Sequence, residues 1–285
     1  MEKMSAASSV RRWLVEAAQR IDEALGPARI ARIVLPPLAD KPGKEGEFCA
    51  VQLDDGSVGL AFTLLDGTPA ALHARGQQAG RAALDLVQGF ATGDGAVRAL
   101  GLATINALTR RLYDRAGFVP DDSIDSFGSL SLKPGDRLGM VGHFTPLIGQ
   151  ARELGIPVTV LELKPELVRE EPGLVVTLDS KRLAGCNKIV STSTLLLNDT
   201  FEAVAGCWRG AEAVAIVGPS AGCPPDPLFA VGVSAVGTAW VADAEGFLAR
   251  CSAGEKWGPT SRKVTLTPQR YPGLDALLAA KCAQP

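Results

Sequence analysis

The chain has 285 residues, of which 46% are hydrophobic and 21% are charged. This composition can bury a sizeable core, so we exclude wholesale disorder and expect two domains or one large one. The formal net charge of -2 lacks the basic field of a nonspecific nucleic-acid binder. No apolar run approaches the roughly 18 residues of a membrane span. We therefore expect neither nucleic acid nor a membrane as a partner.

The six cysteines contain no C-x-x-C pair, and the first residues lack the apolar core of a signal peptide. A chain of this length does not need a disulfide scaffold to fold. We therefore expect a cytoplasmic protein whose thiols are reduced.

Residues 1–120 are expected to form an α+β unit. Asp55-Gly56 separates two apolar runs and is typical of a hairpin turn. Apolar spacing predicts a helix, a three-stranded antiparallel meander and two further helices, at residues 8–25, 28–65, 80–90 and 96–116.

A polar, turn-rich stretch at 119–136 is predicted to connect this unit to a second one at 136–285. In the second unit, helices are expected to begin at Thr145, near Ser193 and near Pro227, and a last helix is expected at the C-terminal end. Strands are predicted at 137–141, 157–161, 174–178, 188–191, 213–217 and within 231–241. Strands with little polar alternation, separated by helices, indicate a parallel sheet covered on both faces. The prediction is an α/β fold whose second domain is Rossmann-like.

In an open parallel sheet, ligands bind outside the carboxyl ends of the strands, and four such ends carry unusual sequence. The first is Gly142-His143-Phe144-Thr145-Pro146. Gly142 permits a tight turn, Thr145 fits an N-cap and Pro146 fits the first helical position. Free N–H groups at this helix start could hold an anion. An ordinary strand-to-helix turn with a structural His143 explains the same residues equally well.

The second and third strand ends offer carboxylate and hydroxyl groups. Glu162 follows Gly142 by 20 residues, the spacing of a ribose-binding carboxylate in dinucleotide folds. The full G-x-G-x-x-G is absent, so we do not expect NAD, and this spacing is the only support for a nucleotide-binding regulatory module. The third end carries four consecutive hydroxyls and makes Ser193, Asn198 and Thr200 candidate ligand contacts.

The fourth strand end contains a formal G-x-S-x-G around Ser220, the signature of a nucleophile elbow. We reject a hydrolase because both histidines precede Ser220, whereas the α/β-hydrolase order requires one after it. A rigid anion-binding turn formed by Gly218, Pro219 and Ser220 is the better interpretation.

Cys223 lies in the same loop and is the only thiol in the four strand ends. It is a candidate metal ligand, for which His143 and Glu162 are conceivable partners. The recognised motifs H-E-x-x-H, paired C-x-x-C, EF-hand and P-loop are absent from the sequence.

Several stretches, in this order, resemble a bacterial and archaeal family of unknown function described as heavy-metal chelation proteins. They are GLATINAL, VGHFTPLI, LELKPE, STSTLLLNDT and VGPSAGCPPDPLFAVGVSAVGTAWVAD. The family pairs an enolase N-terminal-like domain with a Rossmann-like domain. The resemblance implies a site between the domains that includes Asn106, Gly142, Thr145, Pro146, Glu162, Ser193, Asn198, Thr200, Gly218, Pro219 and Ser220.

These observations predict a small-ligand binding protein with its site in the interdomain cleft. The ligand or cofactor is left open between a heavy-metal ion, a metal chelate and a small anion. The alternative is an enzyme that acts on a small phosphorylated or carboxylate substrate, with Glu162 as catalytic acid or base. A second copy of the chain, in a homodimer, is a further candidate partner.

Overall fold

The computed structural model describes residues 6–38, 48–63, 68–76, 78–122 and 130–280. The N-terminal unit confirms the predicted order of a helix, an antiparallel meander and helices, and adds one short helix that the sequence did not predict. Its elements are α1 (Ala6–Leu25), β1 (Ile30–Val34), β2 (Phe48–Leu53), β3 (Val58–Phe62), α2 (Thr68–Arg75), α3 (Ala83–Thr92) and α4 (Gly95–Arg115).

The hairpin between β2 and β3 forms at the predicted Asp55-Gly56 turn. Gly56 has a φ of +90°, which glycine adopts without steric cost. Asp55 Oδ1 accepts a hydrogen bond from the Ser57 N–H at 3.0 Å. β3 then packs directly on α4, because a Cβ on Gly59 would lie 2.1 Å from the carbonyl oxygen of Ala103. This close approach fixes α4 against the outer strand of the meander.

A second sheet runs through the rest of the described chain in the order β4-β12-β11-β10-β9-β5-β6-β8-β7. The central strands from β11 to β8 are parallel, which confirms the Rossmann-like part of the prediction. The edges β4, β12 and β7 are antiparallel and were not predicted. The bounds are β4 (Asp121–Asp122), β5 (Leu138–Val141), β6 (Val158–Leu161), β7 (Arg169–Glu171), β8 (Leu174–Thr177), β9 (Lys188–Thr192), β10 (Ala213–Val217), β11 (Ala235–Val241) and β12 (Ser261–Leu266).

The helices of this second part differ from the prediction in three places. Thr145 is the first residue of its helix, the N-cap is Phe144, and neither side chain caps the helix. After β9 the chain forms a 3₁₀ turn at Ser193–Leu196 before the next helix. The helices are α5 (Thr145–Glu153), α6 (Phe201–Cys207), α7 (Asp226–Ala230), α8 (Ala244–Ala253) and α9 (Leu274–Ala280). α8 was not predicted, whereas the C-terminal helix α9 was.

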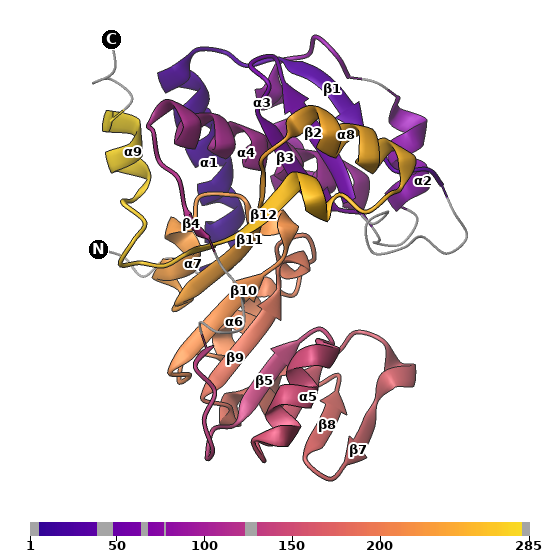
Figure 1. The fold of residues 1–285 in the computed structure, drawn as a ribbon, viewed down its shortest axis with the longest axis vertical. Coiled ribbons are helices and arrows are strands. Elements are labelled where there is room, and N and C mark those ends of the chain that lie inside the picture. The colour runs from indigo at the N-terminus through magenta and orange to yellow at the C-terminus, as the bar shows by residue number, and fades with distance from the viewer. Residues whose placement is uncertain (1–5, 39–47, 64–67, 77, 123–129, 281–285) are drawn as a thin grey trace.

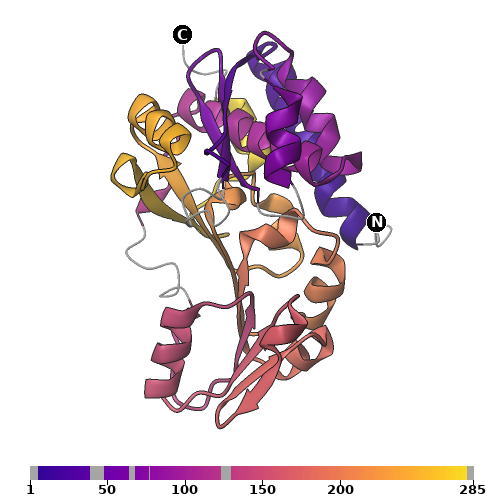
Figure 2. The same cartoon turned by 90° about the vertical axis from the view of Figure 1, so that its right-hand side faces the viewer.

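The two parts of the chain share a core. α8 and α9 return to the N-terminal unit, so they lie with it over one end of the large sheet (Figure 1). α5 and strands β5 to β8 extend away from it as a lower lobe, and the large sheet connects the two regions (Figure 2). Apolar side chains such as Leu14, Leu108 and Val236 are buried in one continuous cluster across this junction.

The predicted connection at 119–136 is only partly visible, because residues 123–129 lie outside the described residues. Its first part contributes β4 to the edge of the large sheet, and Leu130 is buried under the lower lobe. Within the described ranges, every helix is too short or too polar to span a lipid bilayer.

Candidate functional site

A cavity of about 340 Å³ lies where the carboxyl ends of β5, β6 and β9 meet the end of β3. We call it the strand-end cavity. Four residues predicted from the sequence line it: Gly142, Glu162, Asn198 and Thr200. The other residues of its wall are Phe62, Val141, Leu161, Leu163, Lys164, Leu178, Ser180, Thr192, Thr194, Leu195, Ala203 and Val204. Parallel strands bring their carboxyl ends to one edge, so residues distant in sequence share this cavity.

Gly142 and Glu162 take their places because each directly follows a paired strand. The Gly142 N–H donates to Leu161 O, and the Glu162 N–H donates to Thr177 O, each at 3.0 Å. Gly142 has a φ of +89°, and a Cβ there would lie 3.3 Å from the Thr192 methyl group. The Glu162 side chain is half-buried and accepts one long hydrogen bond, from the Leu163 N–H at 3.3 Å. Its carboxylate can therefore accept further bonds from a ligand.

Asn198 is a residue of the cavity wall. Its Oδ1 accepts from both the N–H and the hydroxyl of Thr200, at 3.1 and 2.6 Å. The Nδ2 group has no hydrogen-bond partner among the described residues. The amide donor is thus available to a guest molecule, whereas the Thr200 hydroxyl proton is already used.

Two arginines of the N-terminal unit hold this loop from outside. Arg11 donates to Asn198 O at 2.5 Å and forms an ion pair with Asp199 at 2.7 Å. Arg98 donates to Leu197 O at 2.9 Å. The hydrogen bond from Arg11 lowers the pKa of the Asp199 carboxyl, against a smaller opposing effect of desolvation. These contacts tie a cavity-lining loop of the sheet to α1 and α4.

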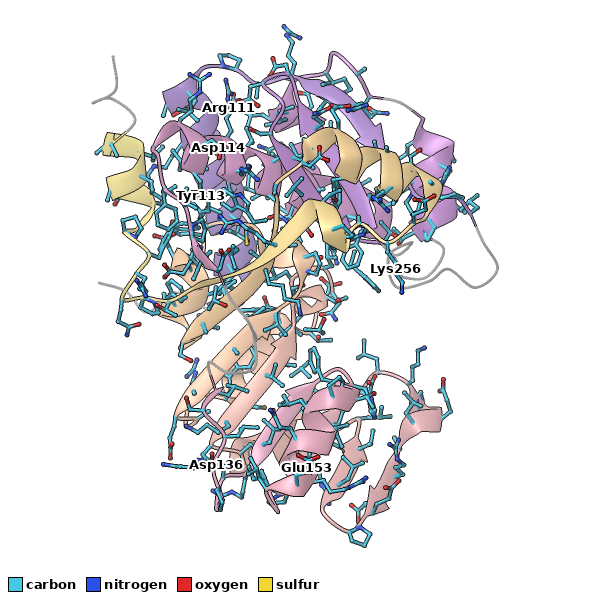
Figure 3. The ribbon with its side chains drawn as sticks, in the orientation of Figure 1. Arg111, Tyr113, Asp114, Asp136, Glu153 and Lys256 are labelled. Atoms are coloured by element: carbon cyan, nitrogen blue, oxygen red, sulfur yellow. The ribbon has the colours of Figure 1, made fainter. Side chains whose placement is uncertain are left out.

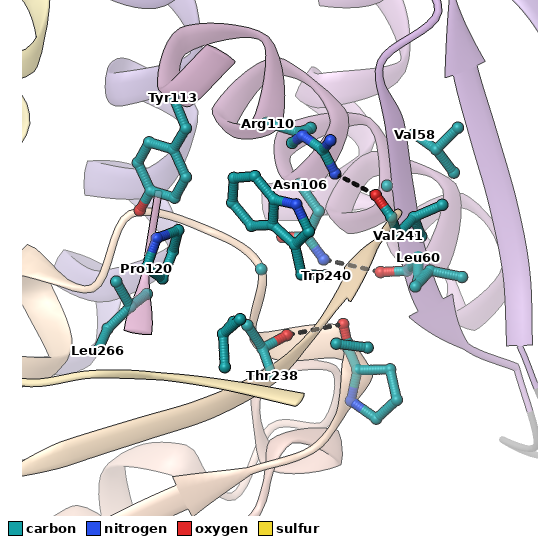
Figure 4. Close-up of a pocket in the computed structure, with 15 residues that line it drawn as sticks. Val58, Leu60, Asn106, Arg110, Tyr113, Pro120, Thr238, Trp240, Val241 and Leu266 are labelled. Atoms are coloured by element: carbon teal, nitrogen blue, oxygen red, sulfur yellow. Dashed lines mark hydrogen bonds between the residues drawn. The ribbon is translucent and has the colours of Figure 1, made fainter. Parts of the chain in front are cut away.

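Asn106 and Ser220 do not line the strand-end cavity but fasten the edge of β3. Asn106 Nδ2 donates to Leu60 O at 2.7 Å and to Ser220 O at 3.0 Å, and the first bond is drawn in Figure 4. Ser220 Oγ accepts from the Phe62 N–H at 3.0 Å. We call these bonds the β3-edge contact. They satisfy backbone groups that the edge strand would otherwise leave open, and they hold Phe62 at the cavity wall.

The remaining predicted ligand contacts lie elsewhere around the same strand ends. His143, Thr145 and Pro146 are exposed at the turn before α5, with Thr145 Oγ1 3.4 Å from His143 Nδ1. Ser193 is buried behind Gly218. Pro219 and Gly218 line a separate cavity beside β11 and β12. The structure therefore brings together four of the predicted site residues in the strand-end cavity and distributes the others around it.

The described residues do not fit a heavy-metal ion. Cys223 is fully buried, and this burial raises the pKa of its thiol to about 12. Metals bind the thiolate, so this protonated thiol is a poor ligand. Across the described part of the chain, no group of three or more His, Cys, Asp or Glu side chains is placed to hold a metal. His143 and Glu162 therefore do not complete a centre with Cys223.

Some cavity residues were missed by sequence reasoning. Phe62 ends β3 of the other unit, and no local signal places it opposite the large sheet. Ser180 belongs to a 3₁₀ turn after β8. Thr192 and Thr194 stood in the run of four hydroxyls, but only Ser193 was chosen. Side chains alternate between the two faces of a strand, so this alternation would have favoured Thr192 and Thr194 over Ser193.

Two family models, both with the description "Putative heavy-metal chelation", match residues 125–268 and 46–109. Among solved structures, a protein of unknown function from Pyrococcus horikoshii matches with a TM-score of 0.65 and 16% identity, over 89% of this chain and 99% of that one. One from Desulfitobacterium hafniense matches with a TM-score of 0.60 and 19% identity, over 90% and 98%. At these identities the likeness shows the fold alone.

A muconate cycloisomerase from Azorhizobium caulinodans also matches, over 82% of this chain and 86% of that one at 16% identity, but its TM-score of 0.32 supports no argument. No curated protein matches the chain. The two solved proteins above are both described as members of the DUF364 family. Because the model of that family alone matches just over half of the sequence, the chain belongs to the DUF364 family, whose function is unknown.

Proposed function

We propose that this protein binds a small organic molecule in the strand-end cavity. The observation that carries the proposal is the convergence of Gly142, Glu162, Asn198 and Thr200, from three strand-to-helix junctions, on one cavity. Its volume of about 340 Å³ is within the range of small-molecule sites, which are mostly apolar with a few placed polar groups.

The wall predicts an amphipathic ligand. Phe62, Leu195 and Val204 supply apolar surface, and Leu163 and Leu178 at the wall are 65% and 48% exposed. An apolar guest would remove this surface from water at about 25 cal/mol per Å². The bound molecule should therefore have an apolar body.

The polar end of the ligand would meet groups of both signs. The Glu162 carboxylate accepts hydrogen bonds, whereas the Asn198 Nδ2 group and the Lys164 ammonium donate them. No described residue pairs with that ammonium. A ligand that carries both a donor and an acceptor would satisfy all three groups.

A metal would reach this cavity only inside an organic chelate. The described residues of the wall contain one carboxylate and several hydroxyl groups but neither a thiol nor an imidazole, and soft heavy metals prefer sulfur and nitrogen ligands. In a chelate the organic molecule supplies those ligands, and the protein needs only to recognise its surface. This form reconciles the family description with the residues that are present.

The test is native mass spectrometry of protein purified under anaerobic conditions. Ala203→Phe adds bulk at an exposed helical position of the cavity wall. As a control, Ala91→Phe makes the same change at an exposed position of α3. We expect a co-purified organic mass, with or without metal, in the wild type and in Ala91→Phe but not in Ala203→Phe.

A thermal-shift panel of small organic acids, amines and metal chelates covers a ligand that is lost during purification. A ligand at 100 times its Kd stabilises the protein by about 2.7 kcal/mol. The proposal fails if neither a retained mass nor a shift is found, or if Ala203→Phe retains the ligand as well as Ala91→Phe does.

An enzyme that uses the same cavity is the second candidate. It is favoured by Glu162, the only acidic side chain among the described residues of the cavity wall, which is half-buried and has few hydrogen bonds. Such a carboxylate can act as a general acid or base. Incubation with the identified ligand decides this point: chemical conversion that Glu162→Gln abolishes supports an enzyme, and an unchanged ligand supports a binding protein.

A further inference from the structure

A second cavity, of about 360 Å³, lies on one face of β11 and β12 and shares no residue with the strand-end cavity. We call it the sheet-face cavity. Gly237 and Ala239 form its floor, and their small size leaves the space open. Gly218, Pro219 and Trp257 are parts of its wall. Nothing in the family description refers to a site at this place.

One strand presents a row of polar side chains here. Gly237 pairs with Thr265, and Ala239 pairs with Lys263. Because side chains alternate along a strand, Ser261, Lys263 and Thr265 point to the same face. Ser261 and Lys263 line the cavity, and Thr265 lies beside its floor.

Two polar groups of the cavity wall have no partner among the described residues. The indole N–H of Trp257 is buried and has no acceptor among the described residues, and the residue as a whole is only 9% exposed. The Lys263 ammonium forms no hydrogen bond or ion pair with a described residue. Both groups can donate hydrogen bonds, and a buried donor without an acceptor is costly.

The charge of the cavity wall has one sign. Among the described residues, its lining contains no acidic side chain. Arg262 also contributes to the wall, but its guanidinium pairs with Asp122 and lies 5.5 Å from the Trp240 ring. Lys263 is therefore the cation that remains unneutralised, so the cavity favours a negatively charged guest that accepts hydrogen bonds.

We propose that the sheet-face cavity is a binding site for a small oxyanion, the carboxylate or phosphate group of a metabolite. Lys263 supplies the charge, and the Trp257 N–H supplies a donor. The apolar faces of Trp257 and Pro219 accommodate the body to which the oxyanion is attached. This site does not depend on the strand-end cavity and stands whether or not that cavity binds its own ligand.

The experiment is a calorimetric titration with two probes at constant ionic strength, inorganic phosphate and citrate, with chloride as the reference salt. Lys263→Met removes the charge from an exposed side chain of similar length. Lys256→Met is the matched control. It removes the same charge from the tip of the segment that joins α8 to β12 (Figure 3), outside the cavity wall.

We expect saturable binding of at least one probe, and the stronger one tells phosphate from carboxylate. Lys263→Met should raise its Kd at least about tenfold, the effect of losing a charged hydrogen bond. Lys256→Met and the cavity variant Ala203→Phe should change it less than about twofold. Trp257→Phe, which keeps the apolar ring and removes the donor, should raise Kd less than Lys263→Met does.

Three results would overturn the assignment. The first is that neither probe gives saturable binding above the chloride reference. The second is an equal loss in Lys263→Met and Lys256→Met, which would show nonspecific attraction to surface charge. The third is an unchanged Kd in Lys263→Met. Circular dichroism of each variant shows whether the fold is retained, and the exposed position of Lys263 makes retention the expected result.

Discussion

The β3-edge contact should contribute measurably to stability, and Asn106→Ala tests it. The substitution removes an amide that donates to two buried carbonyls, Leu60 O and Ser220 O. A buried acceptor left without a donor costs about 1–3 kcal/mol, so the two together cost about 2–6 kcal/mol. Removal of Asn106 Oδ1, which is itself buried without a donor, returns about 1–2 kcal/mol. We expect the free energy of unfolding to fall by about 1–4 kcal/mol.

Urea unfolding followed by circular dichroism measures this loss, and calorimetry should show Tm lowered by about 2–8 °C. Thr109→Val is the matched control. It removes a buried hydroxyl from the same helix, but that hydroxyl donates only to Ile105 O within the helix, at 2.8 Å. The control should cost less than about 1 kcal/mol. If Asn106→Ala destabilises the protein no more than Thr109→Val, the reasoning about the β3-edge contact is wrong.

Three further predictions follow from local geometry. Gly59→Ala should prevent soluble expression, because its Cβ would overlap the α4 backbone. The control Gly206→Ala adds a Cβ to open space in α6 and should raise the stability by up to about 1 kcal/mol. Similar yields of the two variants would contradict this prediction. The folded pKa of Asp199 is lowered by Arg11, so its stabilisation is complete above the unfolded value of about 3.9 and is lost as pH falls through the folded one. The stability difference between wild type and Asp199→Asn should therefore shrink from about pH 5 to about pH 2, and a constant difference would refute the assignment. Cys223→Ala should leave bound Zn²⁺ and Cd²⁺, measured by elemental analysis, unchanged because the thiol is buried and protonated; a lower metal content would count against this.

The parts of the fold that were predicted correctly are those with a strong local pattern. The apolar run at β10 has no polar alternation and could only be a buried strand. β12 was missed because Arg262 and Lys263 interrupt its apolar residues. These two side chains point to opposite faces of the sheet, and only the pairing with β11 reveals that the segment is a strand. In this case the strand forms because of its tertiary contacts, and a short window of sequence does not contain that information.

The site divides along a similar line. Gly142 and Glu162 were found because topology alone places every parallel strand end at one edge. The family resemblance implied Asn106, and the loop after the fourth strand suggested Ser220. Their polar atoms are used inside the protein, on the backbone of β3. A side chain that can bind a ligand can equally bind a neighbouring strand, and only the fold distinguishes the two uses.

The attachment of Phe62 has a consequence for motion. The turn after β10 fastens this side of the strand-end cavity, and β5 and β6 carry the opposite side. Since β10, β9, β5 and β6 are consecutive neighbours in one sheet, separating the two sides would break ladder hydrogen bonds. Two-domain receptors commonly close around a ligand by a hinge motion. Here the site is instead preorganised, so affinity depends on shape complementarity rather than on the free energy of closing.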